Sequence, residues 1–440
     1  MQRVITTDDF VTGIRCPRQL WYRMNGPEDD GSPLHRAYEE DQYRRLASVA
    51  GLSAEPEVRE CELTPEWRAL ARVEVLGKSE SGRSLIFLRP TTSVKDSFVW
   101  EAAFADHVFA RTGAGGGEVV LRYLRKTYRR SPGDGYQGLL IDADVTRRAR
   151  GRAAEVPSRL ERMMEILALP EDYMLEQVDP CRRRSCPVCT AGRSKVERLA
   201  ELPPGSEISP VQEIHLAARA SGERHVDRPA IAAFLEGLEY PLSFLDFEAY
   251  SEAVPTAAGI APWEHVPVIY SLHRRERPGA SPVHHVYAAP PGEDGRAGLY
   301  RDLVARIGER GSIVVYGKGF ERRMLERLAP AAPLPPPQLE NIIPRLVDIS
   351  RIFARGEYYD PRQEGSASLK AVYQAMIGGE YGDLEVADGR DANVLYYFLR
   401  HGFPAGQELT ADAVLEDLKR YCSLDTEALV HIVGNLSLLV

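Results

Sequence analysis

The segment YPLSFLDFE (240–248) decides the fold of the C-terminal half. Its apolar run is typical of a buried strand, and its charged residues are Asp246 and Glu248. Side chains two residues apart on a strand point to the same side, so both carboxylates should project from one face. Two adjacent anions favour a bound cation, and Mg²⁺ or Mn²⁺ prefers such oxygen ligands. The alternative is a strand end whose acidic pair is solvated.

The segments around this strand indicate an α/β fold. A helix is expected over 228–239, a strand, glycine turn and helix over 311–328, and a long helix over 411–439. The Pro- and Gly-containing segment that begins at Glu201 is typical of a boundary. We therefore expect one domain over 1–200, a linker and helix over 201–239, and a second domain over 240–440.

Three further residues could act with the acidic pair. Glu321 follows the glycine turn at the expected carboxyl end of a strand, where the sites of open sheets gather. The alternative for Glu321 is a helix-start glutamate favoured by the helix dipole. Tyr421 and Asp425 are four residues apart and would share one helix face, although such a pair is often incidental.

The order of these residues, D-x-E on a strand, an acid after a second strand and Y-x-x-x-D on a late helix, resembles the DnaQ-like 3′–5′ exonucleases of the RNase H fold, in the tyrosine-bearing branch of the DEDD superfamily. The resemblance implies that Asp246, Glu248, Glu321 and Asp425 hold two Mg²⁺ or Mn²⁺ ions, and that Tyr421 orients the attacking water. Two such ions assist an in-line phosphodiester displacement. The family's middle motif reads Asn-x-x-Phe-Asp, whereas this chain ends it with Glu, which could change metal spacing or activity.

The segment EGSASLK (364–370) follows in the same half. Its polar residues Ser366, Ser368 and Lys370 are candidates for phosphate contacts. A solvated loop is the alternative for this segment.

Cysteines form a second pattern. CRRRSCPVC (181–189) brings three cysteines close together, which favours a metal site over buried structural thiols. Either Zn²⁺ or an iron–sulfur cluster would need a fourth ligand. With the early cysteine of GIRCPRQLWYR, the pattern resembles the RecB-family nucleases that carry an iron–sulfur staple. The resemblance implies that a [4Fe–4S] cluster is held by Cys16, Cys181, Cys186 and Cys189, with Zn²⁺ as the alternative.

The resemblance also implies a nuclease site between these cysteines, built from an Asp, a Glu-x-Lys and a Gln. The corresponding positions here are Glu74, Phe87 with Arg89, and Ala105. Because Phe cannot ligate a metal, we expect a degenerate, inactive PD-(D/E)XK domain of the restriction-endonuclease type that binds DNA or supports the chain. Both halves together resemble an uncharacterised bacterial family that joins a RecB-like domain to an RNase H-like domain.

The charge pattern leaves nucleic acid open as a partner. The 440 residues include 55 Lys and Arg against 64 Asp and Glu, a net charge of −9, but a net charge hides local patches. Basic runs lie at 122–130, 146–152 and 182–184, and they suit phosphate contact or form solvated faces. The candidate nucleic-acid contacts in the first run are Arg122, Arg125, Lys126, Arg129 and Arg130.

Composition excludes several other classes of protein. Hydrophobic residues make up 44% of the chain, no run of about 18 apolar residues occurs, and six cysteines are too few for a disulfide scaffold. The N-terminus lacks the pattern of a signal peptide, so a cytoplasmic location with reduced thiols and no membrane partner is expected.

These observations predict a metal-dependent 3′–5′ exonuclease that acts on DNA, at single strands or ends, in repair or anti-phage defence. A helicase or another defence protein could be its partner. The alternatives are a non-catalytic DNA-end-binding subunit of a larger complex and an RNA exonuclease.

Overall fold

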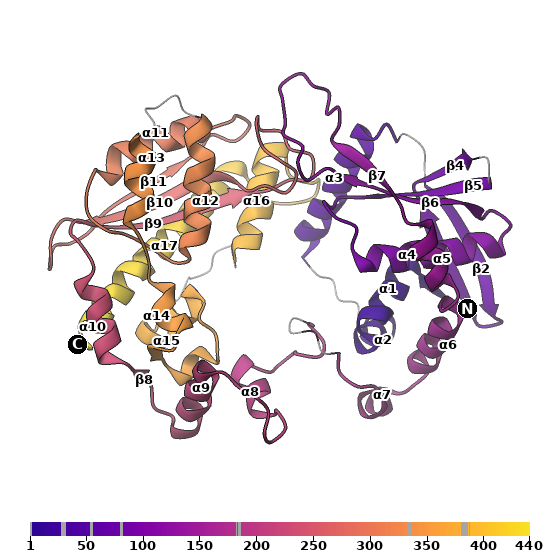
Figure 1. Ribbon diagram of the computed structural model, residues 1–440, viewed down its shortest axis with the longest axis horizontal. Coiled ribbons are helices and arrows are strands. Elements are labelled where there is room, and N and C mark those ends of the chain that lie inside the picture. The colour runs from indigo at the N-terminus through magenta and orange to yellow at the C-terminus, as the bar shows by residue number, and fades with distance from the viewer. Residues whose placement is uncertain are drawn as a thin grey trace. The chain divides into compact units, whose positions relative to one another are not determined.

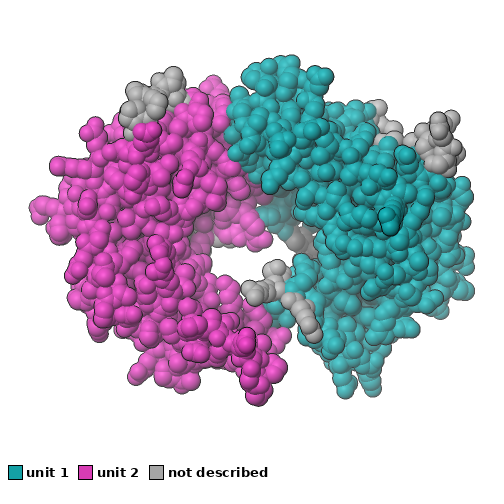
Figure 2. Space-filling view, viewed as in Figure 1, with its two compact units in different colours: residues 1–192, 252–264 teal, residues 193–251, 265–440 magenta. Residues whose placement is uncertain are grey.

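The computed structural model describes residues 2–27, 32–52, 56–79, 82–181, 183, 186–331, 337–379, 386 and 388–440. The chain has a mixed α/β fold and divides into two compact units, coloured separately in Figure 2. Unit 1 comprises residues 1–192 and 252–264, and unit 2 comprises residues 193–251 and 265–440.

These limits differ from the predicted domains in two places. Residues 201–239, expected as a linker and helix, belong to unit 2, where the His215 ring stacks on Tyr359 with centroids 4.0 Å apart. Residues 252–264 belong to unit 1, where the indole N–H of Trp263 donates to the Pro90 carbonyl at 2.9 Å. Both differences depend on contacts between residues far apart in the chain.

Unit 1 contains two small sheets with helices packed against them (Figure 1). One sheet has the order β1-β3-β2, from β1 (Arg3–Thr6), β2 (Glu57–Thr64) and β3 (Trp67–Val73). The other has the order β4-β5-β6-β7, from β4 (Val75–Ser79), β5 (Gly82–Arg89), β6 (Gly116–Leu124) and β7 (Leu140–Asp144). The helices are α1 (Thr7–Arg15), α2 (Pro17–Asn25), α3 (Pro33–Val49), α4 (Asp96–Arg111), α5 (Thr146–Ala153), α6 (Val156–Leu167) and α7 (Glu171–Gln177).

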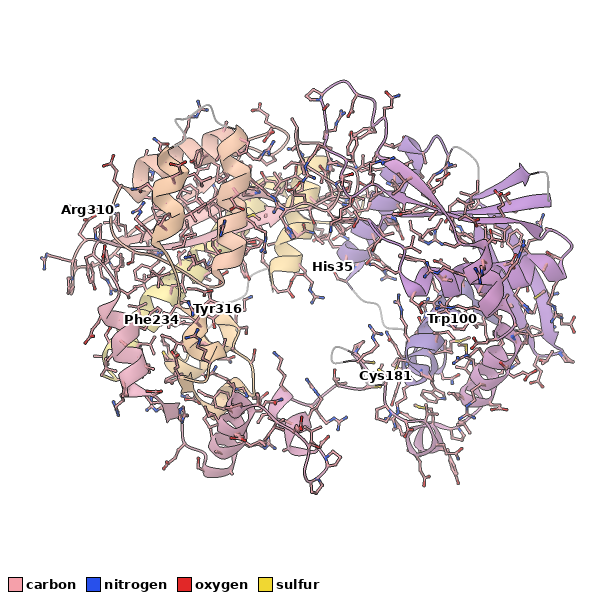
Figure 3. All side chains as sticks on the ribbon, viewed as in Figure 1. His35, Trp100, Cys181, Phe234, Arg310 and Tyr316 are labelled. Atoms are coloured by element: carbon pink, nitrogen blue, oxygen red, sulfur yellow. The ribbon has the colours of Figure 1, made fainter. Side chains whose placement is uncertain are left out.

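Helix α4 lies in the core of unit 1. Its Phe104 ring is fully buried and stacks on Phe10 of α1, with centroids 4.8 Å apart. Trp100, labelled in Figure 3, lies on the same helix, and the guanidinium groups of Arg152 and Arg159 lie over its ring. Two arginines of unit 1 are therefore engaged within the protein.

Unit 2 is built on a five-stranded mixed sheet with the order β11-β10-β9-β12-β13. Its strands are β9 (Leu242–Tyr250), β10 (Val266–Arg275), β11 (Val283–Ala288), β12 (Ile313–Val315) and β13 (Leu346–Asp348). The pairs among β11, β10 and β9 are antiparallel, whereas β12 is parallel to both β9 and β13. A separate pair joins β8 (His225–Val226) to β14 (Tyr358–Tyr359).

Helices cover both faces of the five-stranded sheet. Leu245 and Phe247 of β9 pack with α11 (Arg296–Ile307) and α12 (Lys318–Leu328), which lie in front of the sheet in Figure 1. Phe244, on the opposite face, packs in a core with Leu429 of α17 (Ala411–Ser437). The remaining helices are α8 (Lys195–Ala200), α9 (Pro210–Ser221), α10 (Arg228–Glu236), α13 (Pro337–Ile342), α14 (Ser350–Ala354), α15 (Leu369–Ile377) and α16 (Gly389–His401).

The main sequence-based elements of this half are confirmed. The predicted strand is β9, the strand–turn–helix of 311–328 is β12 followed by α12, and the two predicted helices are α10 and α17. Among the described residues, every helix is too short or too polar to cross a membrane.

Candidate functional site

Strand β9 places Asp246 and Glu248 on the sheet face that packs against α17. The alternation along β9 puts them on the same side as Phe244, which belongs to the core shared with that helix. Strand β12 pairs only with Ser243 and Phe244, so Asp246 lies beyond the pairing between these two parallel strands. The two carboxylates therefore lie beyond the end of the neighbouring strand β12, where other groups can approach them.

Helix α17 brings three polar side chains to the same region. Tyr421, Cys422 and Asp425 all lie on its buried face, although they follow β9 by more than 170 residues in the sequence. The Cys422 thiol lies 3.4 Å from Oδ2 of Asp246 and 3.7 Å from the main-chain oxygen of the same residue. One ligand atom each from Asp246, Glu248 and Cys422 lies within 4.8 Å of the others, a spacing at which the three could hold a metal ion.

A tight turn positions Glu321 near this group. Gly317 has φ of 100°, a left-handed conformation that favours glycine, and α12 starts at the next residue. Asp348 of β13 accepts the N–H groups of Gly317 and Lys318 at 3.0 and 3.1 Å, which fixes the start of the helix. Glu321 follows in the first turn and is 2% exposed, and its Oε2 atom has no hydrogen-bond partner among the described residues.

Electrostatics tie the four predicted carboxylates together. Burial raises the pKa of Asp246, and the charges of Asp425, Glu248 and Glu321 raise it further. Burial and the charge of Asp425 likewise raise the pKa of Glu248. Burial raises the pKa of Glu321 to about 8, with a smaller contribution from the charge of Asp348. Buried anions repel one another in this way unless a cation offsets them, so the arrangement suits a cation site.

The phenol of Tyr421 lies beside these acids. It is 5% exposed, and burial together with the charges of Asp425 and Glu248 raises its pKa above the ordinary value. The ammonium group of Lys370 lies 4.5 Å from the centre of the Tyr421 ring, and its charge lowers the pKa of Glu248. Lys370 is thus a cation of the chain itself that acts on Glu248.

The two serines predicted near Lys370 serve the local backbone. Ser368 caps α15 by accepting the N–H of Ala371 at 3.3 Å, and the hydroxyl of Ser366 donates to Ser368 Oγ at 3.2 Å. A phosphate contact by either serine stays a prediction.

The four predicted cysteines form one group. Sγ of Cys16 lies 3.5 Å from that of Cys189 and 3.6 Å from that of Cys186, and the Cys181 N–H lies 3.3 Å from Cys189 Sγ. All four sulfur atoms lie within 4.8 Å of one another and could hold a metal ion. Cys16 caps α2, so the group connects the beginning of unit 1 to a segment about 170 residues later. Cys181 is labelled in Figure 3.

Two of the acids at and near the positions predicted for a degenerate nuclease site, Glu74 and Glu101, pair with an arginine. The guanidinium of Arg89 pairs with Glu74 at 2.8 Å and forms a bidentate pair with Glu101, in which Nε lies 2.9 Å from Oε2. Glu74 also accepts the Leu88 N–H at 3.0 Å. Ala105 and Phe87 are buried in the apolar core and offer no ligand atom. The guanidinium of Arg89 therefore pairs with both carboxylates, Glu74 and Glu101.

Most basic side chains of the first run, 122–130, are engaged within unit 1. Arg122 forms a bidentate pair with Asp142, at 2.7 and 2.8 Å, and Arg129 lies 3.4 Å from Glu264. Arg130 pairs with Asp134, Arg125 donates to the Gly138 carbonyl at 3.0 Å, and Lys126 is exposed. In the third run, Arg182 and Arg184 lie outside the described residues. Nucleic-acid contact by these runs stays a prediction.

Two residues near the carboxylates were missed by the sequence-based analysis. Cys422 is three residues before Asp425, a spacing that shares a helix face, but it was assigned only to the helix. Asp348 was not considered, because its role depends on the pairing of β13 with β12. The spacing to Asp425 could have indicated Cys422, whereas no short-range pattern in the sequence indicates the role of Asp348.

Comparison with known proteins gives one match. Residues 243–368 match the model of a domain of unknown function, DUF2779, a range that includes Asp246, Glu248 and Glu321 and ends before Tyr421 and Asp425. No RecB-like or DnaQ-like family model matches. No curated protein and no solved structure matches the chain.

Proposed function

We propose that this protein is a divalent-metal-dependent 3′–5′ exonuclease that hydrolyses DNA phosphodiester bonds in unit 2. The observation that carries the proposal is the group of half-buried Asp246 and buried Glu248 with buried Asp425 and Cys422 of α17, near Glu321, whose Oε2 has no partner among the described residues. So many buried acids are costly without a cation. The match to DUF2779 supplies no activity of its own.

We assign the following roles to the residues of the chain. Asp246, Glu248, Glu321 and Asp425 would hold two divalent ions, which when bound supply a nucleophile at neutral pH and offset negative charge on the phosphate. The raised pKa of Tyr421 keeps its phenol protonated, so this side chain can orient a water by hydrogen bonding but does not take its proton. Lys370 is placed to contact a phosphate beside Tyr421.

An assay with labelled oligonucleotides tests the proposal. Wild-type protein with Mn²⁺ or Mg²⁺ should release the label from a 3′-labelled single strand, and a matched 5′-labelled strand should shorten stepwise. Asp246→Ala should reduce digestion to background. The matched control is Asp412→Ala, which removes an exposed carboxylate from the first turn of the same helix that carries Tyr421.

Three outcomes separate the alternatives. Equal digestion by Asp246→Ala and wild type would show that the site is wrongly assigned. Binding of DNA ends by wild type without digestion under any metal would favour a non-catalytic end-binding subunit. Faster digestion of a matched RNA strand would favour an RNA exonuclease, since discrimination rests on contacts to the 2′-hydroxyl.

For the four cysteines, we propose a single zinc ion. Tetrahedral Zn–S bonds of about 2.3 Å place the sulfur atoms about 3.8 Å apart, close to the 3.5 and 3.6 Å distances found for Cys16. A [4Fe–4S] cluster places its own iron and sulfide atoms between the thiolates and would hold them farther apart. The spacing therefore favours the zinc alternative over the iron–sulfur cluster implied by the resemblance.

Metal analysis and absorption spectroscopy test this assignment. We expect a colourless protein that contains zinc and no iron, and that loses one equivalent of zinc in Cys16→Ser but not in Cys61→Ser, because Cys61 lies in the apolar core. A brown protein with iron and acid-labile sulfide would overturn the assignment.

A further inference from the structure

Cys422 lies inside the acidic group of unit 2. Its sulfur is 3.4 Å from Oδ2 of Asp246, and it falls within 4.8 Å of ligand atoms of both Asp246 and Glu248. The side chain is fully buried on α17, and no other described cysteine lies in this group. The Cys422 thiol is therefore close enough to the two carboxylates to bind the same metal ion.

A second observation indicates that the group is incomplete by itself. Glu321 is 2% exposed and its Oε2 atom has no partner among the described residues. The charge of Glu321 raises the pKa of Asp246, so the two side chains are within electrostatic range of each other. A buried carboxylate oxygen without a donor is costly, and a bound cation would supply its missing partner.

The presence of a sulfur donor affects which cation the site can bind. Carboxylate oxygens alone suit Mg²⁺, Ca²⁺ and Mn²⁺. A thiolate is a soft ligand that suits first-row transition ions and is a poor ligand for Mg²⁺. A site that combines both therefore discriminates between these classes of ion.

We propose that Cys422 is a direct metal ligand, and that it makes the carboxylate site of unit 2 select a divalent transition ion such as Co²⁺ or Zn²⁺ over Mg²⁺. This inference rests on the proposed function for the presence of a metal, and it adds the chemical class of the ion. Binding would release the thiol proton to solvent. The alternative role for Cys422, a hydrogen-bond donor to Asp246 without metal contact, predicts no sulfur–metal bond.

Cobalt binding gives a readout that does not depend on activity. A thiolate bound to Co²⁺ produces a charge-transfer absorbance in the near ultraviolet. The experiment titrates Co²⁺ into full-length protein whose four-cysteine site already carries its native metal. Wild type should develop this band, and Cys422→Ser and Cys422→Ala should lack it while binding Co²⁺ on the order of tenfold or more weakly.

Two matched variants complete the test. Cys61→Ser removes a buried cysteine of unit 1 and should retain the full band. Asp246→Asn removes the neighbouring ligand and should weaken the band. Any cobalt exchanged into the four-cysteine site would appear equally in wild type and in Cys422→Ser. Thermal melts of each variant establish that it is folded.

The outcomes distinguish this inference from the proposed nuclease activity. An equal band in wild type and Cys422→Ser would overturn the ligand assignment, even if wild type digests DNA. If the band requires Cys422 but the protein digests no nucleic acid, the metal site is supported and the proposed nuclease activity is overturned. If both proposals hold, the ratio of Co²⁺-supported to Mg²⁺-supported digestion should fall in Cys422→Ser.

Discussion

The two units each bury a group of acidic side chains, and they differ in what offsets its charge. In unit 1, Glu74 and Glu101 pair with the guanidinium of Arg89, so the cation is part of the chain. In unit 2, no lysine or arginine among the described residues forms a salt bridge with Asp246, Glu248 or Glu321. The acids of the first group therefore have an internal ion pair, whereas the three carboxylates of the second have none among the described residues.

This difference shows how the same residue type can have opposite roles. An ion pair satisfied within the protein affects stability, and removing one partner leaves an uncompensated charge. A group of acids without such a partner has raised pKa values, which are typical of functional sites. The surroundings of a carboxylate therefore indicate its role better than its presence in a motif does.

The largest expected effect comes from removing the internal cation of unit 1. Arg89→Met leaves Glu74 and Glu101 without their internal cation and should lower the free energy of unfolding of unit 1 by about 3–5 kcal/mol. All four tryptophans belong to unit 1, so tryptophan fluorescence during urea unfolding reports this unit. The matched control is Arg72→Met, at an exposed position on β3.

A triple variant separates charge from packing in the same experiment. Replacing Glu74 and Glu101 with Gln in the Arg89→Met background should recover most of the lost stability, because no buried charge then remains. If Arg89→Met were as stable as wild type, the acids of unit 1 would not depend on an internal cation, and the contrast between the two units would be wrong.

An intermediate effect is expected from pH in unit 2. The folded-state pKa of Glu321, about 8, lies above the ordinary value of 4.5, so the folded protein binds this proton more tightly than the unfolded chain does. The contribution of this proton to the free energy of unfolding is fully present below pH 4.5 and is lost as pH rises through 8. The free energy of unfolding then falls by at most about 1.4 kcal/mol per pH unit.

Urea unfolding followed by far-ultraviolet circular dichroism can measure this dependence between pH 5 and 8.5, without added divalent ions. The transition of unit 2 is the one that leaves tryptophan fluorescence unchanged. Glu321→Gln should flatten the profile of this transition. An unchanged slope in Glu321→Gln would remove Glu321 from the electrostatics of the site.

The smallest effect is expected from Lys370. If Lys370 offset the acids of unit 2 as Arg89 does in unit 1, Lys370→Met would be equally destabilising. Its ammonium lies over the Tyr421 ring, and such a contact contributes about 0.5–1 kcal/mol, so we expect a loss of that size. The measurement is the urea midpoint of unit 2, with Lys419→Met on the same unit as the control. A loss comparable to that of Arg89→Met would show that unit 2 also carries its own cation.

Much of the framework could be predicted from short stretches of sequence. The buried run of 240–248 is β9, the glycine turn before Glu321 starts α12, and the cysteine spacing indicates the group formed with Cys16. These features depend on hydrophobic periodicity, on backbone conformation and on ligand spacing. Each is a property of residues close together in the chain or of a small number of thiols.

The roles of other residues depended on distant partners. Arg89 was recognised only as a departure from a motif, because its pairing with Glu101 requires β5 to pack beside α4. Arg122 and Arg130 were candidates for phosphate contact, yet each pairs with an aspartate of unit 1. A run of basic residues does not by itself reveal which side chains are already neutralised.

Short-range sequence patterns are enough to predict the α/β class, the main strand and helix of unit 2, and the residue types able to bind metal. Tertiary packing was needed to bring Cys422 next to Asp246, to bury Glu321 with no partner for its Oε2 among the described residues, and to position Arg89 between Glu74 and Glu101. The reason is physical. Propensity and periodicity act over a few residues, whereas charge balance depends on distances between groups that the fold brings together.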